Sequence, residues 1–195
     1  MPTMQRFGLK DPTFSTNLAD IQRITSAAHF AAVQHADQRR KGKAGEPYIN
    51  HLIEVADLVA SSLTEPDTNL IMAAFIHDVV EDTPTTNQEV AERFGPDVAA
   101  LVAEVTDDKS LPKAERKRLQ IETAPKKSKR AQSIKVVDKI SNLRAILHSP
   151  PTDWDQQLKK EYVAWAKKVV DGLTEPNAIL KVEFEKTLQE FHGRV

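Results

Sequence analysis

The chain has 195 residues, enough for one substantial hydrophobic core but too few for a second complete domain of ordinary size. Hydrophobic residues make up 40% and glycines number only six, which favours helices over a turn-rich β architecture. The absence of cysteine excludes disulfides, thiolate metal sites and cysteine nucleophiles, and the net charge of −1 argues against a protein that coats nucleic acid.

The N-terminal residues lack the apolar segment of a signal peptide, and no run approaches the roughly 18 apolar residues that a membrane span needs. We therefore expect a cytoplasmic protein with no membrane partner and no nucleic-acid partner. Residues 1–17 form an N-terminal extension to which no function is assigned, and residues 18–195 form a single domain.

Apolar residues recur at helical spacing along the chain, and no segment alternates with the period of a strand. The expected fold is all-α, a bundle of about eight to ten helices. The expected helices cover residues 18–39, 50–63, a segment from 68 through the His77-Asp78 pair, a short helix to 94, one from 96, a charged one ending near 123, 129–147, 155–172 and 177–191. Thr86 and Glu89 have the spacing of a capping box, and Pro96 suits a first helical position.

Four residues from three expected helices have the chemistry of a metal site. His77 and Asp78 are adjacent, His51 lies 26 positions upstream and Asp138 lies 60 positions downstream of Asp78. Helical proteins build metal sites from side chains that converge from facing helices, and two nitrogens with two oxygens suit a first-row divalent ion. Mn²⁺ is the first choice, with Fe²⁺, Co²⁺ and Zn²⁺ open. The competing interpretation is that each histidine is an ordinary packed residue of the core.

Two further carboxylates follow the His-Asp pair. Glu81 is four residues past His77 and Asp82 is four past Asp78, so a helix that continued for one turn would place both beside the metal ligands. Acidic residues at a helix C-terminus oppose the helix dipole, which points to another reason for their presence. We expect Glu81 and Asp82 to orient or deprotonate the attacking water and to protonate a leaving group.

Two basic segments flank these acidic residues. The loop 39–48 contains Arg40 and Lys41, and residues 109–139 contain eleven lysines and arginines against three acids. Asn142 lies one helical turn after Asp138 and can point toward the same cavity. Each feature alone is also compatible with a solvated surface. A carboxylate-rich metal centre between two basic segments, however, is what hydrolysis of a polyphosphate requires.

Four strings together resemble a known family: RRKGKAGEPYINH, AAFIHDVVEDT, EVTDDKSLPKAERKRLQ and KVVDKISNLR. In order and spacing they resemble the hydrolase domain of RelA/SpoT proteins, above all the small alarmone hydrolases, from about residue 27 to 172. The resemblance implies the HD-domain fold, bound Mn²⁺, and removal of the 3′-pyrophosphate of (p)ppGpp to give GDP or GTP plus pyrophosphate. Larger members add a synthetase domain, for which 195 residues leave no room, so hydrolase activity alone is expected.

The resemblance also assigns residues. It implies that His51, His77, Asp78 and Asp138 bind the metal and that Glu81 and Asp82 act on the attacking water. It implies further that Arg40 and Lys41 flank the guanine, that Asn142 helps to hold the nucleotide, and that Lys109 and Arg116 contact phosphates. One departure is Leu52, where the family often has proline, and this affects the helix start without removing a ligand.

Two other functions remain open from the sequence. The same metal site could hydrolyse another phosphorylated nucleotide, such as NADPH, because pocket shape and phosphate contacts decide between such substrates. Alternatively, a degenerate enzyme could bind an alarmone without catalysis, which would be favoured by the loss of a ligand or of the Glu81-Asp82 pair. No such loss is visible in the sequence.

Overall fold

The computed structural model describes residues 18–194, and within that range the chain is all-helical with no strand. The helices are α1 (Leu18–Gln34), α2 (Ile49–Ser62), α3 (Thr68–Phe75), α4 (Val79–Asp82), α5 (Asn87–Phe94), α6 (Pro96–Val105), α7 (Lys113–Thr123), the 3₁₀ turn η1 (Ala124–Lys126), α8 (Lys129–His148), α9 (Gln156–Asp171) and α10 (Ala178–Arg194). The predicted all-α class is confirmed. The extension expected over residues 1–17 lies outside the described residues.

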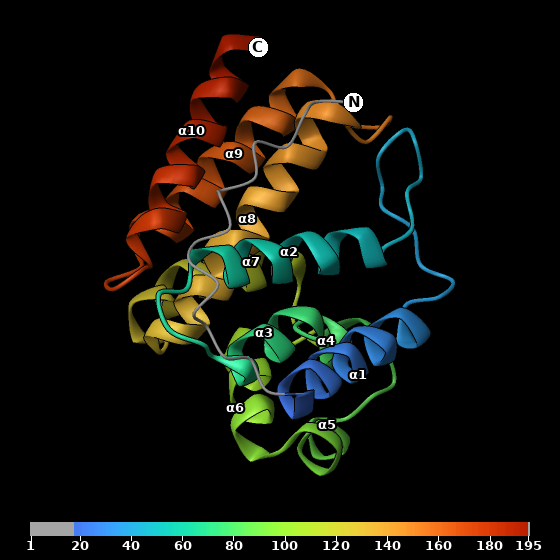
Figure 1. Ribbon diagram of the computed structural model, residues 1–195. Coiled ribbons are helices and arrows are strands. Elements are labelled where there is room, and N and C mark those ends of the chain that lie inside the picture. The colour runs from blue at the N-terminus through green and yellow to red at the C-terminus, as the bar shows by residue number, and fades with distance from the viewer. Residues whose placement is uncertain (1–17, 195) are drawn as a thin grey trace.

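Helix α8 is the central element of the bundle (Figure 1). It packs against α2, α6, α9 and α10, while α1 and α3 pack on each other on the far side of α2. Residues around the whole circumference of α8, such as Ile134, Val137, Ile140 and Leu143, are fully buried, as expected of a helix surrounded by others. Asp138 is therefore carried by the most enclosed helix of the molecule.

The capping predictions hold. The Thr86 side chain accepts from Glu89 N, the Glu89 carboxylate accepts from Thr86 N, and this capping box opens α5. Pro96 is the first residue of α6, as its fixed φ angle favours. Within the described residues, no helix combines the length and the apolar character needed to cross a membrane.

Two predicted helix ends were wrong. The first helix ends at Gln34, five residues before the predicted 39, because the chain turns there. In that turn the backbone carbonyl of Gln38 accepts from Tyr48 N at 3.0 Å, and its side chain reaches the carbonyl of Asp82 at 2.9 Å. The turn thereby attaches the basic loop 39–48 to the segment that carries the acidic residues.

The second correction concerns His77 and Asp78, which were expected near the C-terminal end of a continuous helix. Helix α3 ends at Phe75, and the pair lies in a turn before the short helix α4. Ile76 and Val79, on either side of the pair, are both completely buried. The break lets both apolar side chains reach the core while Asp78 keeps access to a cavity. Glu81 and Asp82 consequently belong to a new helix and not to an extension of α3.

Candidate active site

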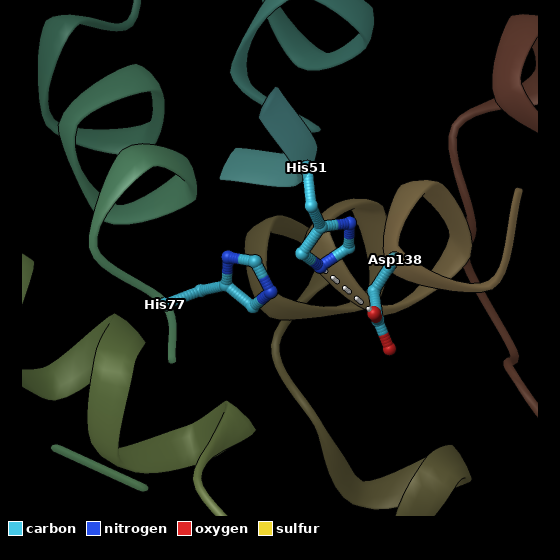
Figure 2. A group of neighbouring side chains, drawn as sticks. All are labelled: His51, His77 and Asp138. Carbon is cyan, nitrogen blue, oxygen red and sulfur yellow. Dashed lines mark ion pairs between the residues drawn. The ribbon is translucent and has the colours of Figure 1, made fainter. Parts of the chain in front are cut away.

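Side chains from three elements meet at one point in the bundle, as Figure 2 shows. His51 comes from the first turn of α2, His77 from the turn after α3 and Asp138 from the middle of α8. One potential ligand atom from each of these residues lies within 4.8 Å of the others, and His51 Nε2 is 3.5 Å from Asp138 Oδ1. Both imidazoles are almost completely buried. This spacing is compatible with one cation held between the three groups.

Asp78 lies at the edge of the same cluster. Its Oδ2 is 3.1 Å from His77 Nε2 and 3.6 Å from His51 Nε2, and the hydroxyl of Tyr48 donates to the same oxygen at 2.7 Å. The four residues singled out in the sequence are thus neighbours in space, although Asp78 is not one of the three whose ligand atoms all lie within 4.8 Å of one another.

Asp138 is held by two donors. Lys139 Nζ donates to Oδ2 at 2.9 Å and Asn142 Nδ2 donates to Oδ1 at 2.6 Å. The amide oxygen of Asn142 in turn accepts from Arg40 Nη2 at 2.9 Å. A hydrogen-bonded chain therefore connects the basic loop to Asp138 and fixes the orientation of its carboxylate.

The electrostatics of the cluster are set by two partly buried carboxylates, those of Asp78 and Asp138. Burial alone would raise the pKa of Asp78, but the two imidazoles outweigh it and hold that pKa well below its ordinary value. Burial also acts to raise the pKa of Asp138, but the nearby Lys139 and His51 outweigh it and lower that pKa. Burial also acts to lower the pKa of His77, yet the two aspartates raise it to about 9. Both carboxylates are ionised and favour a positive charge between them.

One polar atom of the cluster supports the metal interpretation directly. His77 Nδ1 lies 2.9 Å from the carbonyl oxygen of Ala74, which can only accept, so Nδ1 carries the proton. His77 Nε2 is buried and makes no hydrogen bond of acceptable geometry, although Asp78 Oδ2 is near. A buried imidazole nitrogen that makes no hydrogen bond and lies beside carboxylates fits a divalent cation that takes the place of its proton, since imidazole and carboxylate are ligands of such ions.

Glu81 and Asp82 lie next to the cluster, together with the expected cations. Glu81 Oε2 accepts from the backbone of Asp107 at 3.0 Å, while Oε1 is 3.4 Å from Lys109 Nζ and 3.8 Å from Arg116 Nη1. Lys109 also pairs with Asp82 at 2.5 Å. Burial raises the pKa of Glu81, which brings this carboxylate closer to the range in which a general base works well.

A cavity of about 690 Å³ connects these groups. Ten of the eleven residues singled out in the sequence line it, and His51 lies behind them. The ten are Arg40, Lys41, His77, Asp78, Glu81, Asp82, Lys109, Arg116, Asp138 and Asn142. The cavity is large enough for a nucleotide. The acidic segment and the two basic segments, which are separate in the sequence, therefore line one cavity.

The aromatic wall of this cavity was not predicted from the sequence. Trp154, Tyr162 and Trp165 line it, and the ammonium groups of Lys117 and Lys139 lie 4.8 and 4.4 Å from the ring centre of Trp165. The basic segment 109–139 itself contains no aromatic residue, so its own composition gave no sign of them. The three-residue spacing of Tyr162 and Trp165 within the expected helix 155–172 was the available signal.

An all-helical bundle with paired histidines and aspartates at the base of a cationic cavity defines the class: an HD-domain protein. The HD-domain family matches residues 27–181. The MESH1 guanosine-3′,5′-bis(diphosphate) 3′-pyrophosphohydrolase of Drosophila melanogaster is 48% identical over 83% of this chain and 90% of its own length. The human MESH1 protein is 46% identical over 84% of this chain and 91% of its own.

A solved structure is also similar to this chain in sequence and fold. It is described as a metazoan ortholog of SpoT that hydrolyzes ppGpp, and it superposes with a TM-score of 0.82 at 46% identity, covering 86% of this chain and 94% of that one. The bifunctional (p)ppGpp synthase/hydrolase SpoT of Escherichia coli is 36% identical over 65% of this chain but only 18% of its own length. The chain belongs to the HD-domain family and, within it, to the small alarmone hydrolases of the RelA/SpoT superfamily.

Proposed function

We propose that this protein hydrolyses the 3′-pyrophosphate of (p)ppGpp, giving GDP or GTP and pyrophosphate. The observation that carries the proposal is the position of the histidine–aspartate cluster and of the Glu81-Asp82 pair on one cavity that is also lined by cations. Such an arrangement suits a substrate with two diphosphate groups, because the cations compensate the phosphate charge while the acidic side holds the metal and the water.

The metal ligands of the proposal are His51, His77, Asp78 and Asp138, and the ion is Mn²⁺. Two imidazole nitrogens and two carboxylate oxygens suit Mn²⁺ and other first-row divalent ions, and leave positions for water and a phosphate oxygen. When bound, the ion supplies Lewis acidity: it polarises a phosphoryl oxygen and lowers the pKa of water. The buried Nε2 of His77, which makes no hydrogen bond, supports this ligand set.

Glu81 and Asp82 are the proposed catalytic residues. The carboxylate of Glu81 accepts a proton from the attacking water, whose oxygen forms a bond to the phosphorus attached to the ribose 3′-oxygen. The bond between that phosphorus and the 3′-oxygen breaks, and the leaving oxygen receives a proton from the Glu81-Asp82 pair. One water is consumed, and the products are the nucleotide with a free 3′-hydroxyl and pyrophosphate. The raised pKa of Glu81 supports its use as the base.

Five residues form the proposed substrate contacts. Arg40 and Lys41 line the cavity from the basic loop, where a guanidinium can stack on a purine, and Asn142 holds Arg40 from α8. Lys109 and Arg116, within 3.8 Å of Glu81, are positioned to contact the phosphates near the reacting group. Lys109 pairs with Glu81 and Asp82, and Arg116 pairs with Glu81.

The proposed activity is hydrolysis without synthesis. The chain is similar to MESH1 proteins over about nine-tenths of their length, whereas it matches only 18% of the bifunctional SpoT protein.

The substrate assignment is tested by comparing ppGpp and NADPH with the Mn²⁺-loaded protein in one buffer, with product identification by anion-exchange chromatography. The proposal predicts a larger kcat/KM for ppGpp, with GDP and pyrophosphate as products. A larger kcat/KM for NADPH would show that the site prefers a nucleotide with a 2′-phosphate. Tight binding of ppGpp without turnover by metal-loaded protein would instead identify a non-catalytic alarmone-binding module.

A further inference from the structure

A chain of hydrogen bonds leads away from His51 on the side opposite the cavity. His51 Nδ1 lies 2.8 Å from Ser141 Oγ, and Ser141 Oγ donates to Glu54 Oε2 at 2.6 Å. The other carboxylate oxygen of Glu54 pairs with Arg144 at 2.9 Å, and Arg144 also pairs with Glu183 of α10 at 2.7 Å. We call Glu54, Ser141 and His51 the histidine relay.

The relay follows from helix geometry. His51 and Glu54 are three residues apart on α2, and Asp138, Ser141 and Arg144 succeed one another at the same spacing on α8. Residues three apart lie on one face of a helix, and α2 packs directly on α8. The helix face with His51 and Glu54 therefore contacts the face of α8 with Ser141 and Arg144. Neither Glu54 nor Ser141 belongs to the residues assigned to the site above.

The chemistry of the three groups sets the direction of every bond in the relay. An ionised carboxylate only accepts, so the single proton of the Ser141 hydroxyl goes to Glu54. The serine oxygen can then only accept from His51, which requires the proton of the neutral imidazole to be on Nδ1. Nε2 keeps its lone pair, and it is this nitrogen that faces Asp138 at 3.5 Å and Asp78 at 3.6 Å.

We infer that Glu54 and Ser141 are positioning residues that hold His51 as the Nδ1–H tautomer and so present Nε2 to the metal. This inference rests on the proposed metal site but not on the proposed substrate. Outer partners of this kind fix the ring orientation and raise the basicity of a ligating histidine. Arg144 balances the charge of Glu54 and holds its second oxygen, which keeps the carboxylate aimed at Ser141.

Nδ1 of each histidine of the site has a different kind of acceptor. His77 donates to the carbonyl of Ala74 in its own turn, a local contact that forms with the backbone. His51 depends on a side chain of α8, so its orientation exists only when α2 and α8 are packed together. The metal affinity of the protein is thereby linked to the packing of these two helices through Ser141.

The first test measures Mn²⁺ binding to EDTA-stripped protein by isothermal titration calorimetry. Ser141→Ala leaves His51 Nδ1 without its acceptor, and its dissociation constant for Mn²⁺ should rise about 10- to 100-fold. The matched control is Ser133→Ala, which removes another buried hydroxyl of α8 that bonds only to the carbonyl of Lys129 in its own helix. The control should bind Mn²⁺ like the wild type. Equal affinities for both variants and the wild type would overturn the inference.

A second measurement separates positioning from general destabilisation. Glu183→Gln weakens the far end of the ion-pair chain, and so loosens the attachment of α10, without touching Ser141 or His51. It should lower the melting temperature without changing Mn²⁺ affinity, whereas Glu54→Gln should weaken Mn²⁺ binding. At saturating Mn²⁺, the kcat of Glu54→Gln should return close to the wild-type value. A Glu183→Gln variant that lost Mn²⁺ affinity as strongly as Glu54→Gln would contradict a specific positioning role.

The tautomer is measured independently of any metal by ¹⁵N NMR of the imidazoles in stripped protein, with His51 assigned by its loss in His51→Gln. Nδ1 of His51 should be protonated in the wild type, and Ser141→Ala should lose this preference. A wild-type protein with the proton on Nε2 would overturn the inference. If the wild type bound no Mn²⁺ but showed the Nδ1–H tautomer of His51, the proposed metal site would be wrong. The role of Glu54 and Ser141 in orienting His51 would still be supported.

Discussion

The hydroxyl of Tyr48 donates to Asp78 Oδ2 at 2.7 Å, while its ring stacks on His35 with centroids 5.1 Å apart. Burial and the neighbouring Asp78 raise the pKa of Tyr48, so the phenol keeps its proton and remains a donor. Tyr48 thus connects the end of the basic loop with one of the proposed metal ligands. Because the hydrogen bond already orients the carboxylate, Asp78 loses little orientational freedom when the ion binds.

Tyr48→Phe keeps the stacked ring and removes only the hydroxyl. We expect the affinity for Mn²⁺ to fall by about 10-fold, because Asp78 loses the donor that orients it. Isothermal titration calorimetry on stripped protein measures this directly. Tyr162→Phe is the control, since it removes from the same cavity a phenol that makes no hydrogen bond to Asp78. Unchanged affinity in Tyr48→Phe would show that the hydrogen bond does not position the ligand.

Glu81→Gln should separate catalysis from metal binding. The amide can still accept from the backbone of Asp107 but cannot take a proton from water. We expect kcat to fall about 10²- to 10⁴-fold while bound Mn²⁺ per chain is unchanged. Asp138→Asn, by contrast, should lose both the metal and the activity. If Glu81→Gln turned over at the wild-type rate, the assignment of Glu81 as the base would be wrong.

The pH dependence of kcat follows from the same residue. A base must be ionised, and burial raises the pKa of Glu81 above its ordinary 4.5. Activity should therefore fall as the pH falls through this raised pKa, with the acid limb above 4.5. Lys109→Gln removes a cation 3.4 Å from the carboxylate and should move the limb to higher pH. Profiles recorded at saturating Mn²⁺, with bound metal measured at each pH, check this; an unmoved limb in Lys109→Gln would contradict it.

The place of the basic loop depends on a close approach at Gly42. A side-chain carbon at this position would lie 2.2 Å from the carbonyl oxygen of Ser149, so the loop can rest on the end of α8 only with glycine. Gly42→Ala should displace Arg40 and Lys41 and raise KM for ppGpp with a smaller effect on kcat. Gly193→Ala, where an added carbon meets nothing within 4 Å, serves as the control. An unchanged KM would show that the loop does not hold the substrate.

Stability and activity should separate at Thr86, which lies away from the cavity in the capping box of α5. Thr86→Ala removes the hydroxyl that accepts from Glu89 N and should lower the free energy of unfolding by about 1 kcal/mol. Urea denaturation measures the loss, and kcat should be unaffected. A loss of activity without a loss of stability would indicate a link between α5 and the site that the structure does not contain.

Most of the fold could be predicted because helix boundaries are determined locally. The capping box at Thr86 and the proline at the start of α6 act over a single turn, so the sequence contains everything that determines them. The break between α3 and α4 is different. It depends on the burial of both Ile76 and Val79 against the rest of the bundle, and a pattern of spacing within one segment contains no information about that core.

The same distinction applies to the site. His77, Asp78, Glu81 and Asp82 could be singled out because they are consecutive or one turn apart. The partners that orient the ligands lie on other elements and depend on how helices pack. Ser141 meets His51 across 90 residues of sequence, and Tyr48 meets Asp78 across 30. Their only signal in the sequence was a position three residues from a candidate ligand.

The most direct test of the account is release of pyrophosphate from ppGpp by purified, EDTA-stripped protein, with and without added Mn²⁺. We expect stripped protein to be inactive, Mn²⁺ to restore release of pyrophosphate and GDP in equal amounts, and Asp138→Asn to stay inactive with Mn²⁺. Mn²⁺-independent release, or no release from folded and metal-loaded wild-type protein, would contradict it.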